Sequence, residues 1–259
     1  MEQAPQGAQI RDFVGSLARG LSVLRAFNAD FPEMTLTEVA GRTKLTRAGA
    51  RRFLLTLVEL GYVRKNHRLF RLTPKVLELC YAFMASMPIS ERSQPYLKQV
   101  TEQTGESSSL AVLDNADVVY MARSSARRIL MPGIQVGTRL PASYTSLGRA
   151  LLAFKEEQDR EQFLSTVVLE PRTRFSVTSK SALRKELVKI REQGYALVDQ
   201  EFEEGLRALA VPVRDPSNHV VAAINISTNA ATVSIETMVK KFLPVLKKTA
   251  AEIQATLRT

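Results

Sequence analysis

Apolar residues recur every three or four positions over residues 50–60, the spacing expected for one buried face of an α-helix. The positions of this face are Ala50, Phe53, Leu54, Leu57, Val58 and Leu60. Thr46 precedes the segment as a typical N-cap and Gly61 follows it as a typical stop signal. The pattern therefore predicts a helix over 46–60.

The flanking segments complete a recognisable layout. A short helix is expected over TEVAGRT, capped by Thr35 or Thr37 and with Val39 and Ala40 in a core, and Lys44-Leu45 forms the turn to the longer helix. Short apolar runs at 62–63 and 69–72 surround the polar turn RKNHR and predict a β-hairpin. Helix, turn, helix and hairpin in this order are typical of a winged helix-turn-helix.

Charge is concentrated on this segment. Residues 41–75 contain ten Lys or Arg and one acidic residue, and residues 1–75 contribute +7 of the net charge of +10. Such a surface attracts phosphates and gains from counterion release, so the sequence predicts binding to double-stranded DNA. The alternative is a solvated basic face on an ordinary helical hairpin. The residues expected at DNA are Arg19, Thr35, Thr46, Arg47, Ala48, Arg51, Arg52, Lys65, Asn66 and Arg68.

Two further helices flank this module. One is expected over 17–28, capped by Ser16 and with Leu17, Leu21, Val23 and Leu24 turned inward. The other, PKVLELCYAFMASM over 74–87, has Pro at its first position and is apolar on every side from 79 to 85. A helix that is apolar all round needs cover all round, so a partner chain is expected to bury it; the alternative is a core helix of a single chain.

The pattern changes after Gly105. Alternating apolar runs at 107–114 and 118–124 predict a second hairpin, and 128–140 should hold a further strand or two. Helices are expected at 145–154, 157–166 and 179–193, strands at 195–201, 203–215 and 219–228, and a last helix at 234–257. The helix that begins with ISERSQPYLK is expected to break near Pro95. Together these elements predict an α+β domain with an antiparallel sheet.

Several stretches resemble the IclR-type transcriptional regulators, namely SLARGLSVL, LTEVAGRTKLTRAGARRFLLTLVELGYV, LTPKVLEL, TSLGRALLA and EEGLRALAVPV. Within that family, RAGARRFLLTLVELGYV and VGTRLPASYTSLGRALLA are most similar to the Pca/Pob branch. The resemblance implies a GAF- or PAS-like effector domain. It also implies activation of an operon for aromatic-acid breakdown. Homodimers, a dimer of dimers as a second assembly, and RNA polymerase as a candidate partner are further expectations.

The expected organisation is a flexible N-terminus over 1–14, a winged helix-turn-helix over 15–73, a linker and dimerisation helix over 74–92, and an effector domain over 93–259. The resemblance points to an effector pocket at Ser146, Leu147, Val198, Asp199, Leu206, Ala208, Asn225 and Ser227. Other members of the family carry serine where Asn225 stands. Met121, Tyr144 and Thr145 are added for shape and stacking against an aromatic ring.

The helix start at Ser146 favours an anion, so the expected ligand is a small aromatic or dicarboxylic acid. Arg123, Arg139 and Arg149 are candidate partners for its carboxylate, with surface ion pairing as the alternative for each.

Little in the sequence indicates an enzyme, a metal or another cofactor. The single cysteine, Cys80, lies on an apolar helix, and the two histidines, His67 and His219, are far apart. No run approaches the length of a membrane span, and the polar start does not look like a signal peptide, so a cytoplasmic setting is expected. Two alternatives stay open: a ligand-independent architectural DNA-binding protein, and an enzyme that carries a DNA-binding head.

Overall fold

The computed structural model describes residues 12–126 and 133–257. The chain forms two compact units, with the boundary between Ser86 and Met87. Each unit has its own core and its own sheet. The α+β class predicted from the sequence is confirmed.

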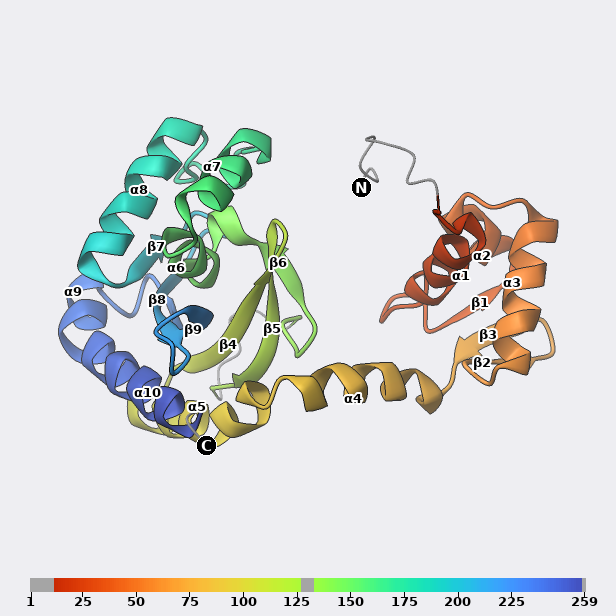
Figure 1. Cartoon of the computed structure of the whole chain (residues 1–259), viewed down its shortest axis with the longest axis horizontal. Helices are drawn as coiled ribbons and strands as arrows, with labels where there is room; N and C mark the ends of the chain where they lie inside the picture. The colour runs from red at the N-terminus through yellow and green to blue at the C-terminus, as the bar shows by residue number, and fades with distance from the viewer. Residues whose placement is uncertain (1–11, 127–132, 258–259) are drawn as a thin grey trace. The chain divides into compact units, whose positions relative to one another are not determined.

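The first unit is a winged helix-turn-helix (Figure 1). Its elements are α1 (Gly15–Arg25), β1 (Glu33–Thr35), α2 (Leu36–Thr43), α3 (Arg47–Glu59), β2 (Val63–Asn66) and β3 (Leu69–Leu72). The strands form an antiparallel sheet in the order β1-β3-β2. The strand β1 was not predicted, because three residues are too few to show a period.

Local hydrogen bonds set the ends of α2 and α3. Thr35 caps α2 in a capping box, in which its side chain accepts from the Glu38 amide and the Glu38 carboxylate accepts from the Thr35 amide. Lys44 ends α2 in the left-handed conformation, with φ of 55°. The Thr46 hydroxyl then accepts from the Gly49 amide at 3.1 Å and begins α3. The prediction of both helices is confirmed.

Three details predicted for these helices are wrong. Ser16 does not cap α1, which begins after Val14 without a side-chain cap. Leu17 and Leu21 are 62% and 48% exposed, because the buried part of α1 is its C-terminal end, around Val23. Leu60 is likewise 52% exposed, because α3 ends at Glu59 and the chain turns there.

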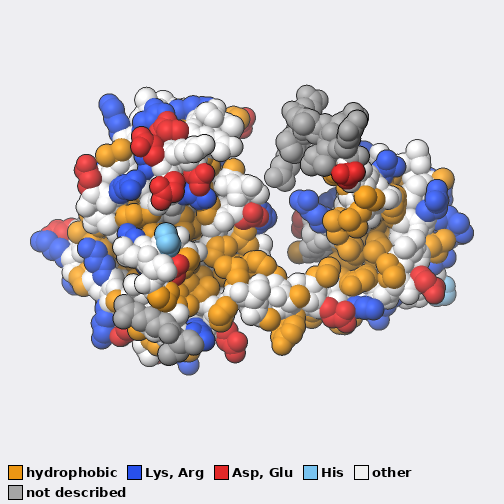
Figure 2. Space-filling model, in the orientation of Figure 1, with side chains coloured by type: hydrophobic (Ala, Val, Ile, Leu, Met, Phe, Trp, Pro, Cys, Tyr) orange, Lys and Arg blue, Asp and Glu red, His pale blue; other side chains and the backbone are white. Residues whose placement is uncertain are grey.

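The segment after the wing carries apolar side chains that the first unit does not cover. A short 3-10 turn, η1 (Pro74–Val76), leads into α4 (Leu77–Ser86). Figure 2 shows hydrophobic side chains gathered over α4. Four of its large side chains are at least 48% exposed: Leu77, Leu79, Tyr81 and Phe83.

The second unit is built on a six-stranded antiparallel sheet in the order β6-β5-β4-β9-β8-β7. Its strands are β4 (Ser107–Asp114), β5 (Asp117–Ser124), β6 (Arg139–Pro141), β7 (Ala196–Asp199), β8 (Leu206–Arg214) and β9 (Val220–Asn229). Its helical elements are α5 (Ile89–Thr104), η2 (Ala142–Tyr144), α6 (Ser146–Ala153), α7 (Glu157–Thr166), α8 (Lys180–Gln193), α9 (Ile235–Thr237), η3 (Met238–Phe242) and α10 (Leu243–Thr256).

Helices cover both faces of this sheet. The helices α5 and α10 contact each other and the sheet, and α6 packs on β8 and β9 with α8 behind it (Figure 1). The core on the α6 side joins Leu147, Leu151 and Leu152 to Leu183 and Leu187 of α8. This packing fixes the start of α6 against the sheet.

Three predictions for this unit need correction or lie outside the described residues. The helix α5 continues through Pro95, which lies exposed in its interior, and ends at Gly105 with φ of 73°. Ile89 and Ser90 are buried on α5 and so belong to the second unit, although the expected linker extended to residue 92. Of the strands expected over 128–140, the described residues contain the start of β6, and residues 127–132 are not described.

Candidate functional site

A basic groove runs between α3 and the β2–β3 turn of the first unit. It is lined by Thr35, Leu36, Thr37, Arg47, Arg51, Leu55, Lys65, His67, Arg68 and Phe70. It therefore brings together five of the residues expected at DNA: Thr35, Arg47, Arg51, Lys65 and Arg68. The same groove includes His67, which the expected set lacked and which stands in the left-handed conformation at the hairpin turn, with φ of 51°.

The other residues expected at DNA lie outside the groove. Ala48 and Arg52 are exposed on α3, and Asn66 is exposed at the end of β2. Thr46 is occupied as the cap of α3, and Arg19 is exposed on α1.

The cations of this groove are not neutralised within the unit. Arg47, Arg51, Lys65 and Arg68 have no carboxylate of the described chain within 4.0 Å of their charged groups, whereas Arg71 on β3 pairs with Glu33 at 3.2 Å. Positive charge without internal partners is the condition under which phosphates are attracted over a distance. The groove is thus a surface for a polyanion.

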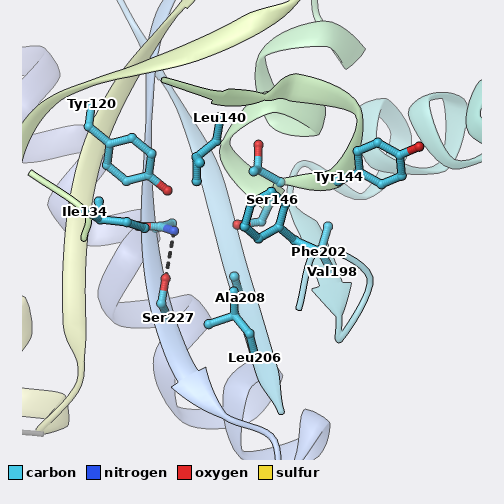
Figure 3. Close-up of a pocket in the computed structure, with 12 residues that line it drawn as sticks. Tyr120, Ile134, Leu140, Tyr144, Ser146, Val198, Phe202, Leu206, Ala208 and Ser227 are labelled. Carbon is cyan, nitrogen blue, oxygen red and sulfur yellow. Dashed lines mark hydrogen bonds between the residues drawn. The ribbon is translucent and has the colours of Figure 1, made fainter. Parts of the chain in front are cut away.

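A pocket lies in the second unit, between the start of α6 and the sheet. The space free of protein atoms in and around it is about 380 Å³, a volume that includes open solvent. Its lining is Tyr120, Ile134, Leu140, Tyr144, Thr145, Ser146, Val198, Phe202, Leu206, Ala208, Asn225 and Ser227. In Figure 3, Tyr120 and Ser227 lie on one side of the space and Ser146 and Phe202 on the other.

Eight of the eleven residues expected at the effector line this pocket, and three do not. Met121 is 2% exposed, lies outside the pocket lining, and its backbone carbonyl accepts from Ser90 of α5. Leu147 is fully buried in the core behind α6. The Asp199 carboxylate accepts two hydrogen bonds from the Arg207 guanidinium, at 2.8 and 2.9 Å.

Four lining residues were missed: Tyr120, Ile134, Leu140 and Phe202. Tyr120 is adjacent to Met121, and the register of β4 and β5 shifts there, with Leu110 opposite Ala122 and Ala111 opposite Tyr120. Such an irregularity breaks the two-residue alternation of a strand, so the sequence did not show which of the two residues faces the pocket. The other three lie on the loop before β6, on β6 itself and on the β7–β8 loop, where no period marks the buried side.

Two polar atoms in the pocket have no partner. Ser146 is 1% exposed and Asn225 is 2% exposed. Neither the Ser146 Oγ nor the Asn225 Oδ1 makes a hydrogen bond to a described residue. Burying such a group unpaired is costly, and these atoms therefore indicate that the pocket receives a polar molecule. Burial raises the pKa of Tyr120 to about 12, so its hydroxyl stays protonated at neutral pH.

The start of α6 is shaped by the TSLG motif. The Thr145 hydroxyl accepts from the Gly148 amide at 3.1 Å, and the Arg149 amide makes the first intrahelical bond, to the Thr145 carbonyl. The amides of Ser146 and Leu147 are therefore donors without an intrahelical partner. Gly148 has a packing role, because a Cβ added there would lie 2.2 Å from the Ala142 carbonyl oxygen.

None of the three arginines considered as carboxylate partners lines the pocket. Arg139 pairs with Asp114 at 2.6 Å and Asp117 at 3.2 Å on the surface. Arg149 is 1% exposed and donates to both carboxylate oxygens of Glu201, at 2.7 and 2.5 Å. Arg123 donates to the hydroxyl of Ser109 on β4, and burial lowers its pKa. The pocket lining as described thus contains no cationic side chain.

The Arg149–Glu201 pair joins two walls of the pocket. Arg149 belongs to α6 and also donates to the Ser143 carbonyl, whereas Glu201 precedes the lining residue Phe202 and accepts from the Val177 amide at 3.0 Å. A mutually satisfied buried pair of this kind holds the helix start and the β7–β8 loop in one arrangement.

Other kinds of site are not indicated. Within residues 12–126 and 133–257, no three His, Cys, Asp or Glu side chains gather as metal ligands would. Over the same residues, no helix is both long and apolar enough to cross a membrane. Cys80 is exposed on α4.

Comparison with known proteins agrees with both units. Residues 16–67 match the IclR helix-turn-helix domain, and residues 81–255 match the bacterial transcriptional regulator IclR C-terminal domain. The chain belongs to the IclR family of transcriptional regulators. It is accordingly a DNA-binding regulator rather than an enzyme.

The narrower likeness to the Pca/Pob branch is also confirmed. The chain is 39% identical to the Pca regulon regulatory protein of Pseudomonas putida, over 91% of this chain and 81% of the relative. It is 33% identical to the p-hydroxybenzoate hydroxylase transcriptional activator of Acinetobacter baylyi, over 94% of this chain and 92% of the relative.

Solved structures show the same architecture. A transcriptional regulator from Rhodococcus sp. RHA1 is 45% identical and superposes with a TM-score of 0.84, covering 95% of this chain and 99% of the other. An IclR homologue from Microbacterium hydrocarbonoxydans, solved with 4-hydroxybenzoate, is 27% identical and has a TM-score of 0.83, covering 94% and 99%.

Proposed function

We propose that this regulator controls an operon for the breakdown of aromatic acids, as an activator, and that a small aromatic or dicarboxylic acid in the pocket of the second unit is its effector. The observation that carries the proposal is the pair of buried, unpaired polar atoms in an otherwise largely apolar cavity. The relatives support it, because one is named for the Pca regulon and another for activation of p-hydroxybenzoate hydroxylase. A ligand-independent architectural protein would have no use for such a cavity.

In this proposal the start of α6 receives the carboxylate of the effector. The amides of Ser146 and Leu147 and the hydroxyl of Ser146 are donors at the positive end of the helix dipole. Ile134, Leu140 and Leu206 supply apolar walls for the rest of the molecule.

The basic groove is proposed as the DNA contact. The cations on α3, Arg47 and Arg51, would enter the major groove, and the β2–β3 turn with Lys65 and Arg68 would follow the phosphate backbone. Arg19, Ala48, Arg52 and Asn66 remain proposed contacts at the margin of this surface.

A second copy of the chain is proposed to cover α4. Its large apolar side chains are exposed around the helix, and water is a poor solvent for them. A dimer would present two winged heads to a repeated or palindromic operator, and effector binding would change their affinity for it. We expect Phe83→Glu to give monomers or insoluble protein by analytical ultracentrifugation, whereas Glu78→Gln on the same helix should leave assembly unchanged. Unaltered assembly in Phe83→Glu would locate the contact elsewhere.

A thermal-shift screen tests the effector assignment. A ligand that binds the folded state alone raises the melting temperature with its degree of saturation. Protocatechuate, 4-hydroxybenzoate and β-ketoadipate should be screened, and at least one should stabilise the wild-type protein.

Two variants locate the binding. Ser146→Pro removes one amide donor at a helix position that tolerates proline, and Ala208→Phe fills the cavity. Both should abolish the shift, whereas Val188→Ala, at an exposed position on α8, should respond as the wild type does. The assignment fails if no acid shifts the wild type or if both pocket variants respond normally.

A further inference from the structure

Asn225 presents an acceptor to the pocket and keeps its donor turned away. Its Nδ2 donates to the Ser227 Oγ at 3.1 Å, which is the contact drawn as a dashed line in Figure 3. In this orientation of the amide, Oδ1 has no partner among the described residues. Because a serine hydroxyl can also donate, the reverse orientation, with Nδ2 facing the pocket, is the alternative to be tested. An amide oxygen accepts hydrogen bonds and donates none.

The neighbours of Asn225 across the sheet do not supply a donor. Ala210 of β8 and Ser109 of β4 are its register partners. Alanine has no polar side-chain atom, and the Ser109 hydroxyl, which accepts from the Arg123 guanidinium at 3.1 Å, makes no hydrogen bond to the Asn225 Oδ1. No described residue thus completes Asn225, and a donor on a bound ligand would do so.

The other polar groups of the cavity are less selective. The Ser146 hydroxyl can donate or accept, and the protonated Tyr120 hydroxyl can do the same. The Asn225 Oδ1 differs from both because it can accept only. It would be left unsatisfied by a ligand without a donor, and it would repel a carboxylate.

We infer that Asn225 is the specificity-determining residue of the effector pocket, and that it accepts a hydrogen bond from a hydroxyl group on the ring of an aromatic acid. This inference rests on the proposed function, in which the carboxylate of the same molecule lies at the start of α6. The two contacts come from opposite walls, since Ser146 begins the helix and Asn225 stands on β9. A ligand that makes both contacts needs a carboxylate at one end and a hydroxyl group at the other, as a hydroxybenzoate has. Open-chain diacids do not fit, because they carry a carboxylate at both ends.

Calorimetric titration of the full chain with matched ligands tests the inference. The donor set is 3-hydroxybenzoate, 4-hydroxybenzoate and 4-aminobenzoate, and the set of similar size without a donor is 4-fluorobenzoate and 4-methylbenzoate. Adipate serves as the open-chain diacid. A site that hydrogen-bonds a substrate hydroxyl discriminates against analogues that lack it, so the best donor ligand should bind about 10- to 100-fold more tightly than either non-donor.

Two variants assign the preference to Asn225. Asn225→Leu has similar volume and no polar atom, so it should weaken binding of 4-hydroxybenzoate about 10- to 100-fold and leave 4-methylbenzoate as tight or tighter. Ser227→Ala removes the hydroxyl that accepts from the Asn225 amide. It should reduce the preference for donor ligands over non-donor ligands without abolishing binding. Unchanged circular dichroism and melting temperature of the unliganded variants would show that they fold.

The outcomes separate this inference from the proposed function. If acids bind the wild type without preference for a donor, or if Asn225→Leu keeps the preference, Asn225 does not read a hydroxyl, although the pocket still binds acids. Tighter binding of adipate or 4-fluorobenzoate would mean that the amide donates to the ligand, which overturns the inference. If none of the acids binds the wild type, the proposed function fails and the inference fails with it.

Discussion

The basic groove and the pocket are both proposed to bind anions, but they offer different chemical groups to them. The groove exposes guanidinium and ammonium groups that pair with no carboxylate of residues 12–126 or 133–257, on the surface of α3 and the wing. The pocket lining has no cation among the described residues, and the buried Arg149 behind it is already paired with Glu201. Free charges suit a long polyanion whose phosphates repeat, whereas neutral donors in a closed site suit one small molecule whose shape must be recognised.

The difference implies different responses to salt. Binding to DNA releases counterions, so its affinity should fall steeply and linearly with the logarithm of salt concentration. Binding of an acid to backbone amides in a buried site is screened much less.

Removing the carboxylate of the buried ion pair should have the largest effect. Glu201→Ala leaves the Arg149 guanidinium, which is 1% exposed, without its partner. Loss of one partner of a buried pair typically costs about 3–5 kcal/mol. Calorimetric unfolding of the full chain should show a large loss for the second unit and none for the winged unit. An Arg149→Met, Glu201→Leu double variant should recover part of the loss, and equal losses in both would argue against an unpaired charge as the cause.

Adding a methyl group at Gly148 should have the next largest effect. The new Cβ would lie 2.2 Å from the Ala142 carbonyl oxygen, so α6 would have to shift away from η2. Overpacking against backbone should cost about 3 kcal/mol and displace the amides proposed to hold the carboxylate. Gly133→Ala is the matched control, because its added Cβ meets nothing within 4 Å. A stable Gly148→Ala protein with normal acid binding would contradict this role of the helix start.

Within the groove, Arg51 and Arg52 form a natural pair for comparison. The two adjacent arginines are both exposed, but Arg51 lines the groove and Arg52 does not. Arg51→Ala should weaken operator binding by about 1–3 kcal/mol if it reads a base. Arg52→Ala should cost less free energy of binding, and it should weaken binding to the operator and to non-specific DNA by the same factor. Fluorescence anisotropy at several salt concentrations measures both, and equal losses would mean that the groove does not define the interface.

The sequence predicted well what is decided locally. Caps such as Thr46, stop signals such as Gly194 and the two hairpins depend on residues within a few positions of each other. Motif resemblance also led to half of the pocket lining. The failures share a different cause, which is dependence on a distant partner.

Three failures illustrate that dependence. Leu17 is apolar and helical, but only the other elements of the unit decide which part of α1 is covered. Met121 and Tyr120 are both compatible with a pocket, and the packing of α5 against the sheet decides between them. Arg149 looked like a surface arginine or a ligand partner, and its actual partner lies 52 residues further along the chain.

The smallest expected effect concerns Glu38, whose carboxylate accepts hydrogen bonds from a residue of the groove. Glu38 accepts from the amide and the hydroxyl of Thr35, a groove residue, at 2.7 and 2.8 Å. These hydrogen bonds, the backbone one first, lower the pKa of Glu38 below its ordinary value. A lowered pKa in the folded state means that this capping box stabilises α2 above the pKa of unfolded Glu38, and that the stabilisation is lost as the pH falls through the folded value.

Because Glu38 is exposed, we expect only local fraying: amides of α2 should exchange faster with deuterium as the pH is lowered toward this value, after correction for intrinsic rates. Glu38→Gln should exchange faster at neutral pH and lose this pH dependence, while Glu59→Gln on α3 should behave as the wild type does. Identical profiles for wild type and Glu38→Gln would mean that the carboxylate does not hold the cap, leaving it available to neutralise the groove.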